Sequence, residues 1–180
     1  MLGSSSGKIR VGATICAAAL ALAAVTGCAA SYGAETQVPY TPADGVYADT
    51  GGLKLRNLVI VSDTAGRGTL VGTIFNEGRT TDALTGIQVS GGGRASLGSA
   101  PISLPAGSGT VVLGADSSLG KALPVTVEGK QVSAGKTVRL TFTFQKAAST
   151  SISVFVVARD GAYATVPAPT LLPPQPGRQS

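Results

Sequence analysis

Residues 137–144 read TVRLTFTF, and this stretch decides the fold class. Val138, Leu140, Phe142 and Phe144 alternate with threonines and an arginine, so an apolar side chain recurs at every second position. Successive side chains of a β-strand point to opposite faces, and this period of two is therefore typical of a strand with one buried and one solvated face. We predict a strand over these residues, with its apolar face against a core.

Similar patterns recur on both sides of this strand. Short runs rich in leucine, isoleucine and valine are separated by turn signals that contain glycine, proline or asparagine. No apolar set recurs at the helical spacing i, i+3, i+4 over three turns, so we predict no helix in the domain. Many short strands with frequent turns imply an all-β fold, an antiparallel Greek-key β-sandwich.

The predicted strands follow one another in a simple order. Residues 53–61 and 69–75 are expected to form a hairpin, after which residues 76–78 turn the chain and residues 84–89 return it. A loose loop is expected over residues 90–94. The remaining predicted strands are residues 102–104 and 110–113, paired across a Pro-Ala-Gly turn, residues 123–127 and residues 151–157.

The N-terminal segment has the parts of an export signal. Lys8 and Arg10 supply positive charge, and an apolar run rich in alanine and leucine covers residues 11–25. A helix of this length rises only about 22 Å, less than the roughly 30 Å of the hydrocarbon core. We therefore expect the segment to be cleaved rather than kept as a membrane helix.

The signal ends in Val25-Thr26-Gly27-Cys28, which resembles the processing site of bacterial lipoproteins at all four positions. In those proteins the cysteine is linked to diacylglycerol, and the signal is cut in front of it. The resemblance implies cleavage between Gly27 and Cys28, lipid attachment at Cys28, and an exported protein anchored at the outer face of the cell membrane. The alternative is an ordinary secretory signal cleaved near Ala29 or Ala30.

These boundaries divide the chain into four parts. Residues 1–27 are the signal peptide, residues 28–44 a lipidated flexible tether, and residues 45–162 the β-sandwich domain. Residues 163–180 are predicted to be a disordered tail, because their prolines remove hydrogen-bond donors and favour extended polyproline II.

Charge and thiol content exclude several classes of function. Removal of Lys8 and Arg10 with the signal leaves 12 of the 14 Lys and Arg residues, against 9 Asp and Glu. This excess is too small and too dispersed for a nucleic-acid-binding surface. Cys16 lies in the signal and Cys28 takes the lipid, so the exported domain has no thiol for a disulfide, a metal or a nucleophile.

Three motifs in order make the chain similar to the periplasmic copper chaperones called PCu(A)C. They are residues 72–78 (GTIFNEG) with Asp82, Leu84 and Gly86, then residues 104–107 (LPAG), then residues 140–147 (LTFTFQKA). The resemblance covers roughly residues 51–157 and implies a cupredoxin-like β-sandwich. The lipoprotein signal and the Pro-rich tail resemble an actinobacterial lipoprotein branch of the family. The family assists assembly of cytochrome oxidase, which implies the respiratory oxidase machinery as a partner.

The copper ligands of the family are absent from this chain. The resemblance places them in two segments, which correspond here to residues 91–97 and about 121–127, and neither contains His or Met. The whole chain has no His, and its single Met is Met1. Cu(I) requires soft thioether, imidazole or thiolate ligands, so we predict no copper site and no cofactor.

The remaining candidate sites have weaker support. A Ser nucleophile has no His as a base, and a Ser–Lys dyad is supported by no motif; its lysine would come from Lys54, Lys121, Lys130, Lys136 or Lys146. No acidic loop has the ligand spacing of a Ca²⁺ site, so we interpret the carboxylates as solvated surface charge: Asp44, Asp49, Asp63, Asp82 and Asp116.

A glycine run raises one further possibility. Gly91-Gly92-Gly93 has the flexibility to cradle an anion beside Arg94. No helix is predicted after it, however, and a flexible loop between strands is the favoured interpretation.

The predicted function is that of a non-enzymatic, membrane-anchored envelope protein that acts through contacts with an envelope or membrane protein. The first alternative is a carrier or sensor of an apolar or cell-wall ligand. The second is residual metal handling through oxygen ligands. A deep apolar cavity would favour the carrier, whereas a solid core would favour the contact function.

Overall fold

The computed structural model describes residues 45–64 and 66–170. The chain divides into two units, Met1–Pro42 and Ala43–Ser180, and the described residues belong to the second. Within them, no helix has the length and apolar character needed to cross a membrane. The predicted signal peptide, the predicted tether and residues 171–180 of the predicted tail lie outside the described residues.

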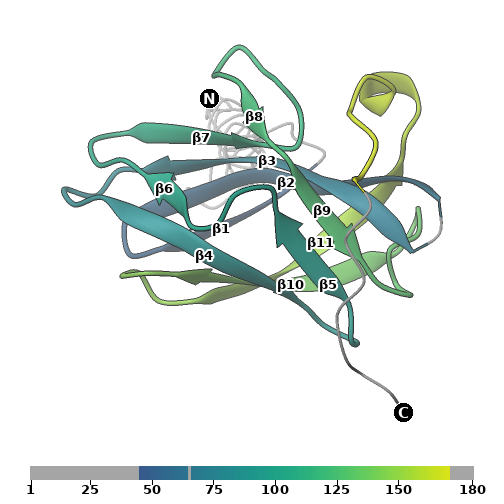
Figure 1. The fold of residues 1–180 in the computed structure, drawn as a ribbon, viewed down its shortest axis with the longest axis horizontal. Coiled ribbons are helices and arrows are strands. Elements are labelled where there is room, and N and C mark those ends of the chain that lie inside the picture. The colour runs from purple at the N-terminus through teal and green to yellow at the C-terminus, as the bar shows by residue number, and fades with distance from the viewer. Residues whose placement is uncertain (1–44, 65, 171–180) are drawn as a thin grey trace, which may run out of the picture. The chain divides into compact units, whose positions relative to one another are not determined.

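The described residues form eleven β-strands and one short 3-10 helix (Figure 1). The elements are β1 (Val46–Thr50), β2 (Leu53–Thr64), β3 (Arg67–Asn76), β4 (Asp82–Val89), β5 (Arg94–Leu97), β6 (Ile102–Leu104), β7 (Gly109–Leu113), β8 (Ala122–Leu123), β9 (Val125–Glu128), β10 (Thr137–Phe144), β11 (Thr150–Ala158) and η3 (Gly161–Tyr163). This content confirms the predicted all-β fold class.

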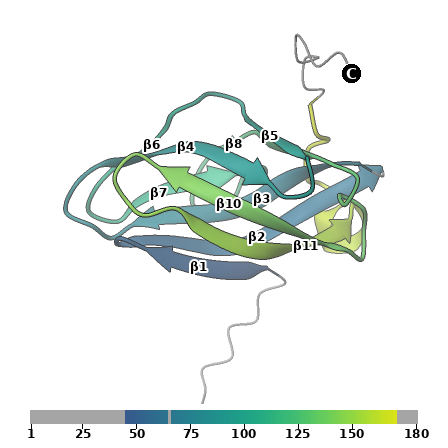
Figure 2. The ribbon, with the colours of Figure 1, turned by 90° about the horizontal axis from the view of Figure 1, so that it is seen from below.

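The strands form one hydrogen-bonded order, β5-β9-β3-β2-β11-β10-β4-β6, which folds over into two layers. The fold occurs at β11, which pairs parallel with β2 in one layer and antiparallel with β10 in the other. Figure 2 shows β4 and β10 on one side and β1 and β2 on the other. The space between the layers is filled by fully buried side chains, among them Leu58, Ile60, Leu70, Ile74, Leu84, Leu140 and Phe142.

The strand predicted over residues 137–144 is β10, with the same bounds. Val138, Leu140 and Phe142 are fully buried and Phe144 is 6% exposed, whereas the residues between them face outward or are only partly covered. Antiparallel pairing with β4 on one side and β11 on the other makes β10 a central strand of its layer. The predicted assignment of its faces is confirmed.

The predicted hairpin of the first two strands is confirmed as β2 and β3. The sequence of β2 is apolar on both faces, and the structure shows what covers each face. Leu58 and Ile60 belong to the main core between the layers. Val59 and Val61 alternate with them, point the other way and pack with Val166 in a second apolar cluster.

This second cluster includes residues that we assigned to a disordered tail. Val166 is only 6% exposed, and Thr69 Oγ1 donates a hydrogen bond to the backbone carbonyl of Pro167 at 2.8 Å. Burial of a valine side chain against two others stabilises the segment after η3, despite its prolines. The packed domain therefore extends to about residue 167, beyond the predicted boundary at residue 162.

One predicted strand pairing differs from the structure. β4 follows β3 in the chain but pairs with β10 and β6, and β6 and β7 do not form the predicted pair. Instead, β6 pairs with β4 and β7 with β3. The turn between β6 and β7 crosses from one layer to the other, and its amides bond elsewhere: Gly107 N donates to Gly78 O and Ser108 N to Asn76 O.

The region after the third predicted strand is also more regular than expected. The predicted loop over residues 90–94 leads directly into β5, a strand that we did not predict because RASL is too short to show a period of two. The single strand predicted over residues 123–127 is divided into β8 and β9. β8 pairs with β7 and β9 pairs with β3 and β5, so the two short strands stabilise different neighbours.

Phe142→Ala is expected to lower the free energy of unfolding by about 3–5 kcal/mol, because a fully buried aromatic ring leaves a cavity between the layers. Thr141→Ala is the matched control on the outward face, where the hydroxyl makes one hydrogen bond, to Ser151 Oγ. Its loss is expected to cost about 1 kcal/mol or less. Chemical denaturation measures both changes, and equal costs would contradict the assignment of the two faces.

Candidate functional site

The two segments that correspond to the copper-ligand segments of the resembled family meet in the structure. Residues 91–97 contain β5, and residues 121–127 contain most of β9. The two strands pair antiparallel, with Leu97 opposite Val125 and Arg94 opposite Glu128. We call this pair of strands the β5–β9 junction. The fold therefore assembles the location at which the resemblance places a metal centre.

The side chains at the β5–β9 junction do not fit copper. Ala95 lies opposite Val127, and Ser96 lies opposite Thr126. None of these offers a thioether, imidazole or thiolate group, and the chain has no His and no Met other than Met1. Because Cu(I) is held by such soft ligands, the hydroxyl and aliphatic groups present here cannot replace them.

Carboxylates do not gather into a metal site in the described part of the chain. No group of three His, Cys, Asp or Glu side chains lies close enough there to hold an ion. Two exposed carboxylates pair instead with neighbouring cations: Asp49 with Lys54 and Arg56, and Asp116 with Lys121. The hypothesis of metal handling through oxygen ligands thus gains no carboxylate cluster from these residues.

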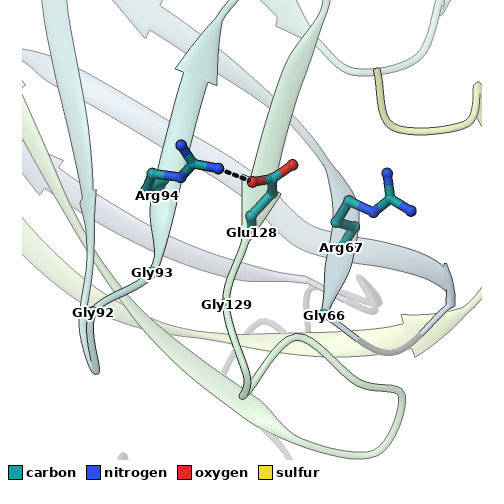
Figure 3. Close-up of a pocket in the computed structure, with 7 residues that line it drawn as sticks. All are labelled: Gly66, Arg67, Gly92, Gly93, Arg94, Glu128 and Gly129. Carbon is teal, nitrogen blue, oxygen red and sulfur yellow. Dashed lines mark hydrogen bonds and ion pairs between the residues drawn. The ribbon is translucent and has the colours of Figure 1, made fainter. Parts of the chain in front are cut away.

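A row of charged side chains crosses three strands at the end of the β5–β9 junction (Figure 3). Arg67 of β3 and Arg94 of β5 both lie opposite Glu128 of β9. Arg94 Nη2 donates to Glu128 Oε2 at 2.7 Å, whereas Arg67 forms no ion pair with the described residues and extends from the other side of the carboxylate. We call these three residues the charged row; it carries two cations and one anion.

A cleft of about 430 Å³ opens beside the charged row. Its lining consists of the charged row together with Gly66, Gly92, Gly93 and Gly129. Backbone hydrogen bonds fix the glycine walls, since Gly129 N donates to Gly66 O at 2.9 Å and Gly66 N donates to Val132 O at 2.6 Å. The wall of the cleft is therefore mostly backbone, and side chains of the charged row supply its chemistry.

The motif residue Asn76 has a structural role at the opposite end of β3. It is 2% exposed, and its Nδ2 donates to the backbone carbonyls of Leu104 at 2.8 Å and Thr80 at 3.0 Å. Its Oδ1 accepts a hydrogen bond from Gly78 N at 3.0 Å. One amide side chain thus ties the last residue of β3 to β6 in the other layer and shapes the β3–β4 connection.

Asp82 is buried rather than solvated, which corrects our interpretation of it as surface charge. It is 6% exposed and accepts three backbone hydrogen bonds, from Ala83 N at 2.7 Å, Lys146 N at 2.9 Å and Ala147 N at 2.8 Å. Burial alone would raise the pKa of Asp82, but these amides and the Lys146 charge lower it on balance. Asp82 therefore fixes the turn between β10 and β11 as a carboxylate.

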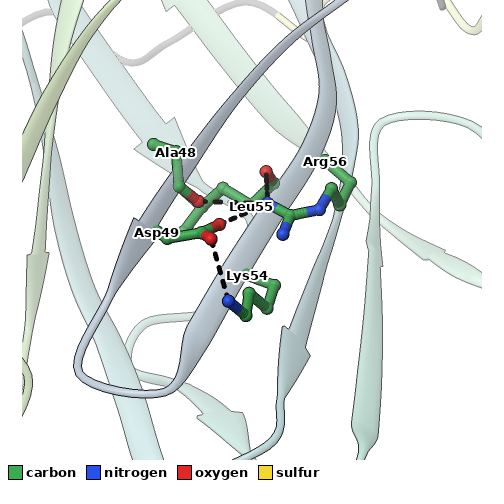
Figure 4. Close-up of polar contacts among 5 residues, drawn as sticks. All are labelled: Ala48, Asp49, Lys54, Leu55 and Arg56. Carbon is green, nitrogen blue, oxygen red and sulfur yellow. Dashed lines mark hydrogen bonds and ion pairs between the residues drawn. The ribbon is translucent and has the colours of Figure 1, made fainter. Parts of the chain in front are cut away.

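Asp49, unlike Asp82, is an exposed carboxylate that pairs with two neighbouring cations (Figure 4). Lys54 Nζ donates to its Oδ2 at 2.8 Å, and Arg56 Nη1 donates to its Oδ1 and to the carbonyl of Leu55. The hydrogen bonds from Arg56 and Lys54 lower the pKa of Asp49 to about 2. Because exposed ion pairs contribute little, we assign this group to the surface of β1 and β2, not to a reactive site.

The structure gives no support to a Ser–Lys dyad among the described residues. Lysines that form side-chain hydrogen bonds there do so with groups other than serine. Lys54 and Lys121 bond to carboxylates, and Lys146 Nζ donates to the carbonyl of Thr81 at 2.6 Å. The predicted lipid-attachment residue Cys28 and the neighbouring Gly27 lie outside the described residues.

The charged row was only partly visible in the sequence. The glycine run beside Arg94 suggested an anion cradle, but Arg67 and Glu128 lie far from it along the chain and showed no motif. They come together only through the register of β3, β9 and β5. A reliable signal would have been the pairing of these strands, which short segments do not specify.

Comparison with solved structures finds the same fold in PCuAC domains. The apo PCuAC domain from PmoF1 has a TM-score of 0.51 at 24% identity, over 63% of this chain and 99% of that domain. The copper-bound PCuAC domain from PmoF2 has a TM-score of 0.50 at 19% identity, over 63% of this chain and 98% of that domain. No family model matches the sequence, and no curated protein does. These likenesses establish a PCuAC-type, cupredoxin-like β-sandwich as the fold.

Asp82→Asn is expected to lower the free energy of unfolding by about 1.5–3 kcal/mol at neutral pH, because a buried charged acceptor of three amides is lost. Asp160→Asn is the matched control, since Asp160 is exposed and forms no side-chain cap. Thermal or chemical denaturation measures both variants, and equal stability of the Asp82 variant and the wild type would contradict the assigned role.

The Asp82→Asn variant also tests how the contribution of Asp82 to the free energy of unfolding depends on pH. The lowered pKa of Asp82 means that its contribution is fully present above the unfolded-state value of about 3.9 and is lost as pH falls through the lower folded-state pKa. The stability difference between wild type and Asp82→Asn is therefore expected to shrink below about pH 4. A difference that does not change with pH would show that the charge of Asp82 is unimportant.

Proposed function

We propose that this protein is an exported lipoprotein, anchored at the outer face of the cell membrane through Cys28, which acts through contacts with another envelope or membrane protein. It has the fold of a copper-chaperone domain but neither carries copper nor catalyses a reaction. The lipoprotein signal and the Pro-rich tail resemble those of the actinobacterial lipoprotein LpqE, and the respiratory oxidase machinery is the first partner to test.

One observation carries this proposal. The β5–β9 junction brings together the segments that correspond to the family's ligand segments, and it contains Ser96, Thr126 and the Arg94–Glu128 ion pair. The neighbour from PmoF2 is described as copper-bound, whereas this chain has no His and only Met1 as methionine. The fold is thus retained without the soft ligands, which leaves the surface of the sandwich to act.

The interior of the described domain is closed to solvent, which is the arrangement expected of a contact function. The side chains of the main core are each at most 9% exposed and belong to both layers. Exposed apolar groups remain on the surface, where Tyr47 of β1 is 46% and Phe155 of β11 is 52% exposed. Exposed aromatic side chains are frequent anchors of protein contacts, so these two are the first surface positions to examine.

Cross-linking in intact cells tests the anchor and the partner together. Wild-type protein is expected in the membrane fraction, cross-linked to a discrete membrane protein that mass spectrometry identifies. Cys28→Ala removes the residue that takes the lipid and is expected to release the protein into the soluble exported fraction, or to leave it uncleaved, without the cross-link. Cys16→Ala is the matched control in the signal and is expected to behave as wild type.

Two results would contradict the proposal. Mature wild-type protein that is soluble and begins at Ala29 or beyond would show that Cys28 is not lipidated. Anchored protein that forms no discrete cross-link under conditions that capture other membrane complexes would show that it does not act through a protein contact.

A further inference from the structure

The cleft beside the charged row has the dimensions and the charge of a small binding site. Its volume of about 430 Å³ falls within the roughly 300–1,000 Å³ typical of ligand pockets and far exceeds the ~30 Å³ that one water molecule occupies. Glycines form four of its seven lining residues. At Gly92, a Cβ atom would meet nothing within 4 Å, so the space beside this residue is open.

The charges of the cleft favour an anion. The carboxylate of Glu128 is only 16% exposed and is neutralised by Arg94, whose own side chain remains 40% exposed. A guanidinium group has five N–H donors, so the bond to Glu128 leaves donors of Arg94 for a ligand. Arg67 adds a positive charge that no described carboxylate pairs with. Arg94 and Arg67 lie on opposite sides of one carboxylate, and the net charge of the row is positive.

We propose that this cleft binds a phosphate group, with Arg67 as the principal contact and Arg94 as a second donor held in place by Glu128. Phosphate suits the cleft because its several acceptor oxygens and its charge match the fork of donors on a guanidinium, often in bidentate geometry. Glycine walls allow such a group to approach the backbone closely. Exposed Lys130 follows Gly129 and adds positive charge next to the cleft.

Two sources share this chemistry: the headgroup of an anionic phospholipid and a soluble phosphate compound. The proposal goes beyond the contact function, because the cleft binds phosphate whether or not a protein partner exists. Failure of the phosphate test would leave the proposed function intact, and failure of the cross-linking test would leave the cleft intact.

Titration of the purified protein in neutral detergent with inorganic phosphate tests the proposal. Amide resonances of Gly92, Gly93 and Gly129 are followed by NMR, with chloride at equal ionic strength as the reference for nonspecific screening. Phosphate is expected to shift these resonances saturably and chloride is not. If neither phosphate nor phospholipid causes a saturable shift, the proposal is overturned.

Variants identify the contacts. Arg67→Gln is expected to weaken phosphate binding about tenfold or more, because the variant loses at least one hydrogen bond between charged groups. Arg79→Gln is the matched control, an exposed arginine outside the cleft lining, and is expected to bind as wild type. Unchanged affinity in Arg67→Gln, or equal losses in Arg67→Gln and Arg79→Gln, would overturn the proposal.

A second titration distinguishes the two sources. Phosphatidylglycerol added to the detergent micelles is expected to shift the same glycine resonances and to compete with phosphate if the ligand is a lipid headgroup. Shifts with inorganic phosphate but not with the lipid assign the cleft to a soluble phosphate compound. Either result supports a phosphate site.

Discussion

The pairing of β11 with strands of both layers holds the two halves of this β-sandwich together. β11 joins β2 in parallel and β10 in antiparallel, so a single sheet becomes two layers around one core. Its Val154 and Val156 are buried at this corner. The layers are also tied at one end, where Asn76 of β3 bonds to the carbonyl of Leu104 and Asp82 of β4 holds the turn that leads into β11. The β5–β9 junction lies on the other side of β3 and inherits its position from this framework.

The sequence predicted those parts of the fold that depend on local patterns. The alternation of β10 and the hairpin of β2 and β3 were correct, because apolar periodicity is a property of each strand alone. Pairing between distant strands has no such local signature, and β6 and β7 were wrongly paired because their connecting turn crosses between layers. The prolines around Val166 led us to predict disorder there, and its burial was not predicted. The second apolar face of β2, which carries Val59 and Val61, was nevertheless a sign that another segment must pack against it. For the site, the absence of soft ligands was plain from composition, whereas the charged row depends on strand register.

The described residues have the fold of PCuAC domains, and the chain has no His and no Met other than Met1. Part of the β5–β9 junction belongs to the core, since Val125 and Val127 of β9 are buried there and Ala95 and Leu97 of β5 pack against it. The side chains of the junction can therefore differ between proteins of one fold only where they do not face the core. The β5–β9 junction carries hydroxyls and a guanidinium–carboxylate pair, groups suited to hydrogen bonding and anion recognition rather than to Cu(I).

Titration with Cu(I) against a competing chelator shows whether this chain binds copper, with a copper-binding PCuAC domain titrated in parallel as the positive control. The purified mature protein is expected to take up no stoichiometric copper under conditions in which the control domain binds, because hydroxyl, carboxylate and carbonyl oxygens are hard donors that hold Cu(I) weakly. Tight one-to-one binding of Cu(I) by this protein would contradict the claim that the fold is present without its metal site.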